Sequence, residues 1–191
     1  MSAAPGPHRR TERLLLCRPA ATDLDAMYAI HADPATNRHN PTGPVADRSA
    51  AAGMLDGWIA HWERHGFGYW TVRAVTDAEV LGFGGLQRTD VDGERVLNLY
   101  YRFGPRAWGK GHAAEMAQAA LVLADELGTG EPVVALVRDT NLPSQRVATR
   151  AGLTATGTID HGGVPTLVFR RVDPTGRMPQ QRPAGADSAR R

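Results

Sequence analysis

The spacing of hydrophobic positions changes several times along the chain, and each change predicts an element of secondary structure. Apolar stretches that alternate or run continuously indicate seven strands, at Glu12–Cys17, Gly68–Val75, Val80–Arg88, Glu94–Phe103, Pro132–Val137, Leu153–Ile159 and Pro165–Val172. Apolar positions three and four residues apart indicate four helices, at Asp23–His31, between an Asp47 cap and Gly66, at Gly111–Leu127, and from Asn141 or Ser144 to Arg150.

The turns between these elements predict how the strands are arranged. Short polar segments, Thr76-Asp77-Ala78 and Asp90–Gly93, separate three consecutive strands, which indicates an antiparallel meander. The valine-rich run Pro132–Val137 is typical of a strand buried on both faces. Prolines break Asp33–Val45, so we expect a loop there. The pattern predicts an α/β (α+β) fold with a mixed, mostly antiparallel sheet of about seven strands and about four helices.

Length and composition indicate one folded unit. A chain of 191 residues with 42% hydrophobic content can fill one sizeable core. Residues Met1–Arg10 and Asp173–Arg191 hold almost no large apolar side chains, so we expect both ends to be disordered. The expected domain therefore spans residues 11–172.

Charge and cysteine content exclude several classes of function. The formal net charge of +2 gives no strong field for nucleic acid. A single cysteine, Cys17, rules out an internal disulfide, and the scattered histidines lack the compact spacing of a zinc site, so we expect no metal. No apolar run is long enough for a membrane span, and Met1–Arg13 lacks a secretory apolar core. We expect a cytoplasmic protein that binds neither nucleic acid nor membrane.

The segment Arg106–Ala113 carries the strongest chemical signal. It lies where an expected strand runs into an expected long helix. Gly109 and Gly111 let the backbone approach a ligand closely, and the N-terminus of the helix offers free N–H donors and a partial positive charge. The spacing fits neither a Walker A loop nor a dinucleotide-binding fingerprint. We interpret the segment as a pyrophosphate-binding loop, with a structural glycine turn as the alternative.

The sequence Arg106-Ala107-Trp108-Gly109-Lys110-Gly111 resembles the pyrophosphate-binding motif of the GNAT superfamily of acetyltransferases. Continuing to Ala113, it is similar to the branch that acetylates ribosomal-protein N-termini. A second block, Asn141 to Val147 followed by Ala151-Gly152-Leu153, resembles another family motif at the expected separation. The resemblance covers Glu12–Val172 and implies a central sheet that splays in the middle.

The resemblance assigns roles to individual residues. It implies that acetyl-CoA is the co-substrate and that backbone N–H groups from Trp108 to Ala113 hold its two phosphates. The residues implied to bind the cofactor are Tyr101, Phe103, Arg106, Trp108, Gly109, Lys110, Gly111, His112, Ala113, Asn141 and Ser144. The pantetheine arm would insert where Leu99–Phe103 and Val133–Val137 part. Tyr101 and Ser144 are the expected catalytic residues.

Two positions depart from the family pattern. Many relatives place a tyrosine acid at the position of Ala148, so Ser144 is the leading proton donor, with helix capping as its alternative role. Asn98 replaces a glutamate that often serves as base in the resembled branch. The substitutes are Tyr100, Tyr101, Glu94, His112 or a water chain.

The sequence leaves the acceptor open. We expect an acyl-CoA-dependent N-acetyltransferase that acts on a primary amine, either a protein N-terminus or a small molecule, as a monomer or homodimer. The acceptor pocket should involve the first two helices, residues 37–45 and the closing hairpin. The alternatives are a catalytically weak acyl-CoA-binding or sensing module and a nucleotide-phosphate site in another α/β enzyme.

Overall fold

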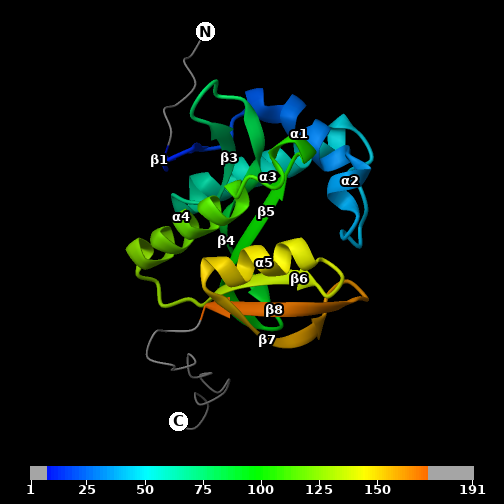
Figure 1. Cartoon of the computed structure of the whole chain (residues 1–191), viewed down its shortest axis with the longest axis vertical. Helices are drawn as coiled ribbons and strands as arrows, with labels where there is room; N and C mark the ends of the chain where they lie inside the picture. The colour runs from blue at the N-terminus through cyan, green and yellow to red at the C-terminus, as the bar shows by residue number, and fades with distance from the viewer. Residues whose placement is uncertain (1–7, 172–191) are drawn as a thin grey trace, which may run out of the picture.

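The computed structural model describes residues 8–171, which form one mixed sheet with helices on both faces (Figure 1). The strands are β1 Arg9–Arg10, β2 Leu14–Cys17, β3 Tyr69–Ala74, β4 Val80–Val91, β5 Glu94–Phe103, β6 Val133–Arg138, β7 Leu153–Asp160 and β8 Pro165–Arg171. The α-helices are α1 Leu24–Ala32, α2 Pro34–Asn37, α3 Arg48–His65, α4 His112–Leu127 and α5 Leu142–Ala151. Short 3₁₀ turns occupy Ala21–Asp23 and Pro105–Ala107.

The predicted antiparallel meander of β3, β4 and β5 is present, and the turn between β4 and β5 sets the register of these two strands. The strands follow the spatial order β1-β2-β3-β4-β5-β6-β8-β7, and every pair is antiparallel except β5 with β6. The β4–β5 hairpin closes with Asp92 and Gly93, whose φ angles of 51° and 80° are typical of a two-residue turn that matches strand twist. The pairing then continues without a register shift from Val91–Glu94 to Gly82–Phe103.

The parallel pairing of β5 with β6 is short. It includes only Leu97 with Val133 and Asn98 with Val134. Beyond these residues β5 stays paired with β4 as far as Phe103, while β6 stays paired with β8 as far as Arg138. The sheet therefore splays between Leu99–Phe103 and Ala135–Arg138, within the segments expected from the sequence.

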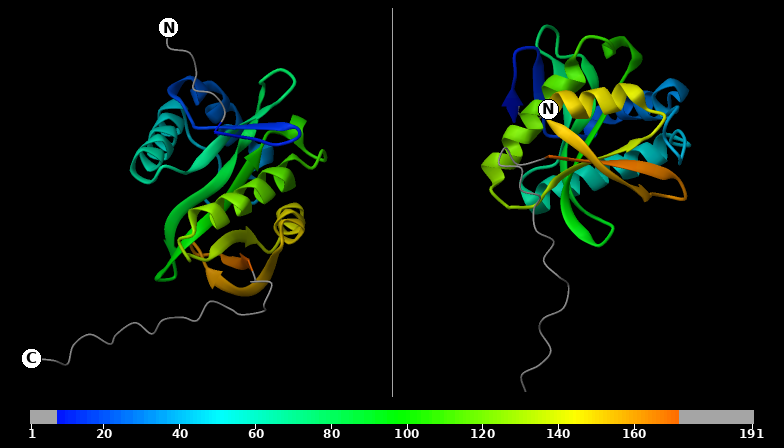
Figure 2. Two further views of the ribbon diagram at one scale, coloured as in Figure 1. Left: turned by 90° about the vertical axis from the view of Figure 1, so that its left-hand side faces the viewer. Right: turned by 60° about the horizontal axis from the view of Figure 1, so that its bottom comes forward.

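Alternate residues of β5 serve the cores on opposite faces of the sheet. Leu97, Leu99 and Phe103 pack in the cluster that includes Met116 and Ala120 of α4. Tyr100 packs against a second cluster made by α1, α3 and Phe83. Figure 2 shows α4 and α5 on one side of the sheet and α3 on the other. The splay therefore opens between two differently built layers.

Several boundaries differ from the sequence predictions. The sheet has eight strands because Arg9–Arg10 pairs with Leu15 and Leu16, although Met1–Arg10 was expected to be disordered. Residues 1–7 and 172–191 lie outside the described part of the chain, with most of both expected disordered ends. The expected loop Asp33–Val45 contains α2, because Pro34 suits a first helical turn and Asp33 caps it through the Ala35 N–H at 2.8 Å. These two short elements account for the higher counts.

A buried carboxylate ties the start of α1 to the sheet. Asp23 is 2% exposed, pairs with Arg73, and accepts hydrogen bonds from the Thr71 hydroxyl at 2.6 Å and the Ala20 N–H at 3.0 Å. Removal of this carboxylate would leave Arg73 without its partner and a buried hydroxyl without an acceptor. The contact fixes α1 against β3.

We predict that Asp23→Ala lowers the free energy of unfolding by about 3 kcal/mol, because one partner of a buried ion pair is lost. The matched control is Asp25→Ala, whose carboxylate also pairs with an arginine, Arg48, but is 82% exposed. Its cost should stay below about 1 kcal/mol. Urea denaturation measures both, and equal losses would contradict the role assigned to Asp23.

Candidate active site

The loop between β5 and α4 takes the shape that its glycines permit. After Gly104 the chain makes the Pro105–Ala107 turn and reaches Gly109 and Gly111 with φ angles of 73° and 80°. L side chains rarely adopt these values, so glycine is favoured at both positions. A Cβ at Gly109 would meet nothing within 4 Å, which leaves that side of the backbone open to a ligand.

Backbone donors gather in this loop. Among residues 8–171, no protein acceptor takes a hydrogen bond from the N–H groups of Gly109 through Ala113. The Trp108 N–H is different, because it donates to the Pro105 carbonyl at 3.2 Å. The free donors lead into the N-terminus of α4, where the helix dipole adds partial positive charge. Such an arrangement suits a diphosphate, with Trp108 contributing less than the sequence suggested.

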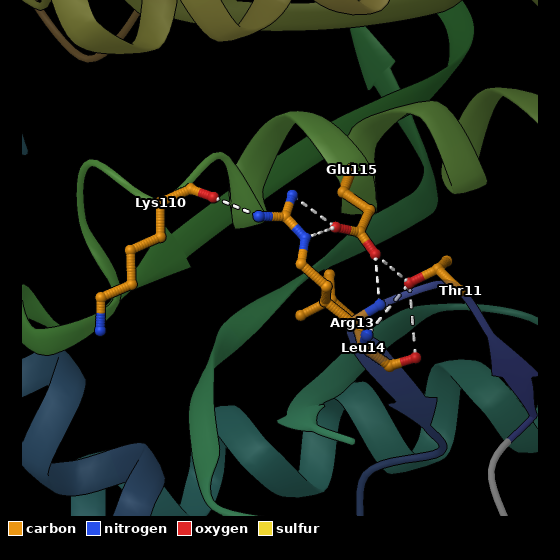
Figure 3. Close-up of polar contacts among 5 residues, drawn as sticks. All are labelled: Thr11, Arg13, Leu14, Lys110 and Glu115. Carbon is orange, nitrogen blue, oxygen red and sulfur yellow. Dashed lines mark hydrogen bonds and ion pairs between the residues drawn. The ribbon is translucent and has the colours of Figure 1, made fainter. Parts of the chain in front are cut away.

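A network from the N-terminal strands holds the loop (Figure 3). The Arg13 guanidinium donates to the Lys110 carbonyl at 2.6 Å and to Glu115, in the first turn of α4, at 2.7 Å. The backbone N–H of Arg13 and the hydroxyl of Thr11 also donate to Glu115, at 2.9 and 2.5 Å. Burial raises the pKa of Glu115, but hydrogen bonds from Thr11 and Arg13 outweigh it and hold the pKa below its ordinary value.

This network was not predicted from the sequence. Arg13 is 102 positions from Glu115, and neither residue belongs to a recognisable motif. The only local signal is an acidic residue in the first turn of a helix, which is common for reasons of helix stability alone. The Lys110 carbonyl is turned toward Arg13, while the Lys110 side chain runs away from the network (Figure 3).

The remaining loop side chains are placed less directly for binding. The Arg106 side chain is 92% exposed and lies 3.8 Å from Glu79. The Trp108 indole is half exposed and donates to the Phe103 carbonyl at 2.7 Å. Phe103 itself is 6% exposed in the core, so its side chain supports the loop from beneath. Burial and the Arg13 charge lower the pKa of His112, whose buried Nδ1 has no hydrogen-bond partner among residues 8–171.

Tyr101 and Ser144 meet across the splay. The Tyr101 hydroxyl donates to the Ser144 carbonyl at 2.8 Å, which links β5 to the first turn of α5. Burial raises the pKa of Tyr101, so its hydroxyl stays protonated. The Asn141 side chain accepts from the Ser144 N–H at 3.2 Å and is the N-cap of α5. Asn141, and not Ser144, therefore caps this helix, and the Ser144 hydroxyl makes no hydrogen bond to another of residues 8–171.

Polar side chains line β5 on the opposite face. The Asn98 amide donates to the Tyr69 hydroxyl at 2.6 Å, and Arg102 donates to the Asn37 side chain at 2.6 Å. Between them, the Tyr100 hydroxyl lies 2.9 Å from Nε2 of His31, whose Nδ1 lies 3.0 Å from the Met27 carbonyl. Because a carbonyl only accepts, Nδ1 carries the proton and Tyr100 donates to Nε2.

The environment of this row keeps His31 and Tyr100 uncharged. Burial and the nearby Arg102 charge lower the pKa of His31 to about 4. Burial raises the pKa of Tyr100 to about 12. Glu94, another base considered from the sequence, lies at the distant hairpin turn and pairs with Arg170 at 2.5 Å. Glu94 therefore lies at the end of β5 that is far from the splay, and its carboxylate is already paired.

Two negative findings apply to the described residues. No helix within residues 8–171 is long and apolar enough to cross a membrane. The same residues contain no group of three or more His, Cys, Asp or Glu side chains placed to hold a metal ion.

Comparison with known proteins identifies the family. The family described as "Acetyltransferase (GNAT) domain" matches residues 13–154. The uncharacterized protein YkkB of Bacillus subtilis (strain 168) is 29% identical over 118 residues, which cover 60% of this chain and 69% of YkkB.

Solved structures share the fold. An acetyltransferase from Agrobacterium tumefaciens str. C58 is 27% identical with a TM-score of 0.73, over 89% of this chain and 95% of that one. RimL, the ribosomal L7/L12 alpha-N-protein acetyltransferase solved with coenzyme A, is 17% identical with a TM-score of 0.70, over 84% of this chain and 94% of RimL. The free donors at the start of α4 and the splay beside them thus lie in a chain that belongs to the GNAT family of acetyltransferases.

Proposed function

We propose that this acetyltransferase transfers the acetyl group directly to a primary amine, on a protein N-terminus or a small molecule, with both substrates bound together. The observation that carries the proposal is the row of unpaired backbone N–H groups from Gly109 to Ala113, beside strands that have parted. The first feature suits a diphosphate, and the second leaves unpaired strand edges between which an extended arm can bind. RimL, whose fold this chain shares, was solved with coenzyme A.

The residues present fit acetyl-CoA. The donors from Gly109 to Ala113 would hold its phosphates, and Arg13 would keep the loop in place by holding the Lys110 carbonyl. The Asn141 oxygen is used in capping, which leaves its amide N–H groups to bind the arm. Acetyl-CoA supplies an acetyl group activated as a thioester.

Transfer forms a bond from the amine nitrogen to the acetyl carbon and breaks the bond from that carbon to sulfur. The attacking amine loses one proton to water, the departing sulfur gains one from a serine hydroxyl, and that hydroxyl takes a proton back from water. Ser144 lies at the start of α5, where its backbone carbonyl accepts a hydrogen bond from Tyr101. Its side-chain hydroxyl is the proposed proton donor to sulfur. The Tyr101 hydroxyl already donates to that carbonyl, so Tyr101 is proposed to position Ser144. Holding both reactants in place lowers the barrier without a carboxylate base.

The decisive experiment is incubation of the purified protein with acetyl-CoA and a panel of amines and peptides, with free thiol and acceptor mass both measured. Thiol release that depends on the acceptor, with a gain of one acetyl group on it, supports the proposal. Binding of CoA with neither event would favour the alternative, a catalytically weak acyl-CoA-binding module.

We predict that Gly109→Val or Gly111→Val weakens CoA binding at least tenfold, because valine is strained at positive φ and the cradle would deform. Lys110→Ala should weaken it less than either, since the proposed contacts are made by backbone N–H groups. Isothermal titration calorimetry measures all three. A larger effect from Lys110→Ala would show that a charge cluster, and not the backbone, binds the phosphates.

Ser144→Ala tests proton donation. We predict that kcat falls by about one to two powers of ten while KM for acetyl-CoA changes little, as expected for an interaction that strengthens in the transition state. Melting temperature should stay within about a degree, because Asn141 caps the helix. An unchanged kcat with lower stability would instead assign Ser144 a structural role.

We predict that kcat/KM rises with pH only as the acceptor amine loses its own proton. His31 stays neutral above pH of about 4 and Tyr100 stays protonated below pH of about 12. Burial lowers the pKa of His112, so its neutral form persists to lower pH than that of an ordinary histidine. None of the three changes charge while the amine titrates. Profiles for amines of different basicity should therefore shift with the amine, and a fixed midpoint near 6 would indicate a protein base.

A further inference from the structure

Two arginines beside the splay, Arg102 and Arg138, have no carboxylate partner among residues 8–171. Arg102 of β5 makes one described side-chain hydrogen bond, to the neutral amide of Asn37. The Nε and Nη1 atoms of Arg138, at the end of β6, are buried without any hydrogen-bond partner among residues 8–171. Neither guanidinium forms an ion pair within those residues. Buried guanidinium groups are costly to leave unpaired, so Arg138 in particular requires an explanation.

The sheet places both arginines on the same side of the splay. Asn98 and Val134 are the last paired residues of β5 and β6, and Arg102 and Arg138 each lie four positions further along. Because side chains alternate along a strand, both arginines belong to the face of Asn98 and Tyr100, opposite α4 and α5. The two positive charges thus border the opening from its two strands.

Carboxylates in the bordering segments are already engaged. Asp33 accepts from the Ala35 N–H at 2.8 Å, Asp139 from the Thr140 N–H at 2.7 Å, and Asp160 from the Gly163 N–H at 2.9 Å. Each one stabilises its own turn. His31 and Tyr100, which lie next to Arg102, are held uncharged by burial. None of these carboxylates forms an ion pair with Arg102 or Arg138 among residues 8–171, so the two positive charges on this face have no paired negative charge there.

We propose that Arg102 and Arg138 bind an oxyanion carried by the acceptor, so that the substrate is a primary amine with its own carboxylate or phosphate. The inference rests on the proposed function, because it assigns the acceptor to the face opposite the pyrophosphate-binding loop. Guanidinium groups recognise carboxylate and phosphate through paired, charge-assisted hydrogen bonds.

The same arrangement accounts for Asn98. A free carboxylate on an acceptor favours protonation of its amine, and a guanidinium that neutralises this carboxylate removes that effect. The two arginines also disfavour an ammonium ion directly. The bound amine therefore loses its proton more readily, and position 98 does not need an acidic side chain to accept it.

The test compares four acceptors with acetyl-CoA: propylamine, β-alanine, O-phosphoethanolamine and 1,3-diaminopropane. The measured quantity is kcat/KM for each, from thiol release. We expect β-alanine or O-phosphoethanolamine to exceed propylamine by at least tenfold after correction for amine basicity, and the better of the two identifies the oxyanion. A preference for propylamine or 1,3-diaminopropane would overturn the inference while leaving the transferase activity standing. No thiol release with any amine would instead contradict the proposed function.

Variants assign the preference to the two arginines. Arg102→Gln and Arg138→Gln should each reduce the ratio of kcat/KM for the anionic acceptor over propylamine by about tenfold or more, the usual effect of losing a charge-assisted hydrogen bond. Arg138→Lys should keep part of the ratio. The matched control is Arg95→Gln, on the same strand and exposed, which should leave the ratio unchanged.

KM for acetyl-CoA and the melting temperature distinguish acceptor binding from other roles of these two arginines. If Arg138→Gln raises KM for acetyl-CoA and leaves the acceptor ratio intact, the guanidinium binds the cofactor and the inference is wrong. Arg138→Gln removes no side-chain hydrogen bond among residues 8–171, so it remains informative even where Arg102→Gln lowers the melting temperature through loss of the Asn37 hydrogen bond.

Discussion

The early parting of β5 from β6 is the constraint on which the rest of the site depends. Two residue pairs between β5 and β6 join the halves of the sheet. Past Asn98, β5 is paired only with β4, and β6 is paired only with β8. Unpaired backbone between two strands would be costly if it were sealed from solvent and ligand. The Tyr101 to Ser144 hydrogen bond spans the opening and fixes how the start of α5 faces β5. The loop proposed to bind the pyrophosphate follows directly from the same strand.

The conformation of the loop between β5 and α4 depends on residues that are far from it in the sequence. Its glycines allow the conformation, but they do not select it, because a flexible backbone has many alternatives. Selection comes from Arg13 and Thr11, which bring the N-terminal strands to the first turn of α4 through Glu115. Arg13 also binds the Lys110 carbonyl, so the peptide units at the ligand side are turned with their donors free. The N-terminal segment is thus part of the site although it contains no motif.

Local pattern predicted most elements, because strand and helix periods depend on near neighbours. It identified Arg106–Ala113 and Asn141–Ser144, where turn chemistry and helix ends are visible in the sequence. It could not choose between Asn141 and Ser144 as the cap, since both residue types cap helices well, and only the geometry shows that Asn141 does so. Contacts such as Arg13 with Glu115 or Arg102 with Asn37 join segments far apart in the chain. The spacing of hydrophobic residues along the sequence therefore does not predict them. Two short elements, β1 with 2 residues and α2 with 4, were missed because neither is long enough to show a repeat.

The two-residue turn at Asp92 and Gly93 also sets the parity of β5. Odd positions from Leu97 to Phe103 face α4 and α5, and even positions from Asn98 to Arg102 face the other layer. The alternation of side chains along β5 therefore places Leu97, Leu99 and Phe103 on one face, and the polar residues Asn98, Tyr100 and Arg102 on the other. A turn longer by a single residue would exchange them, placing Arg102 in the apolar layer and Tyr101 away from Ser144. This two-residue turn, remote from the splay, therefore determines which residues of β5 face α4 and α5 and which face α1 and α3.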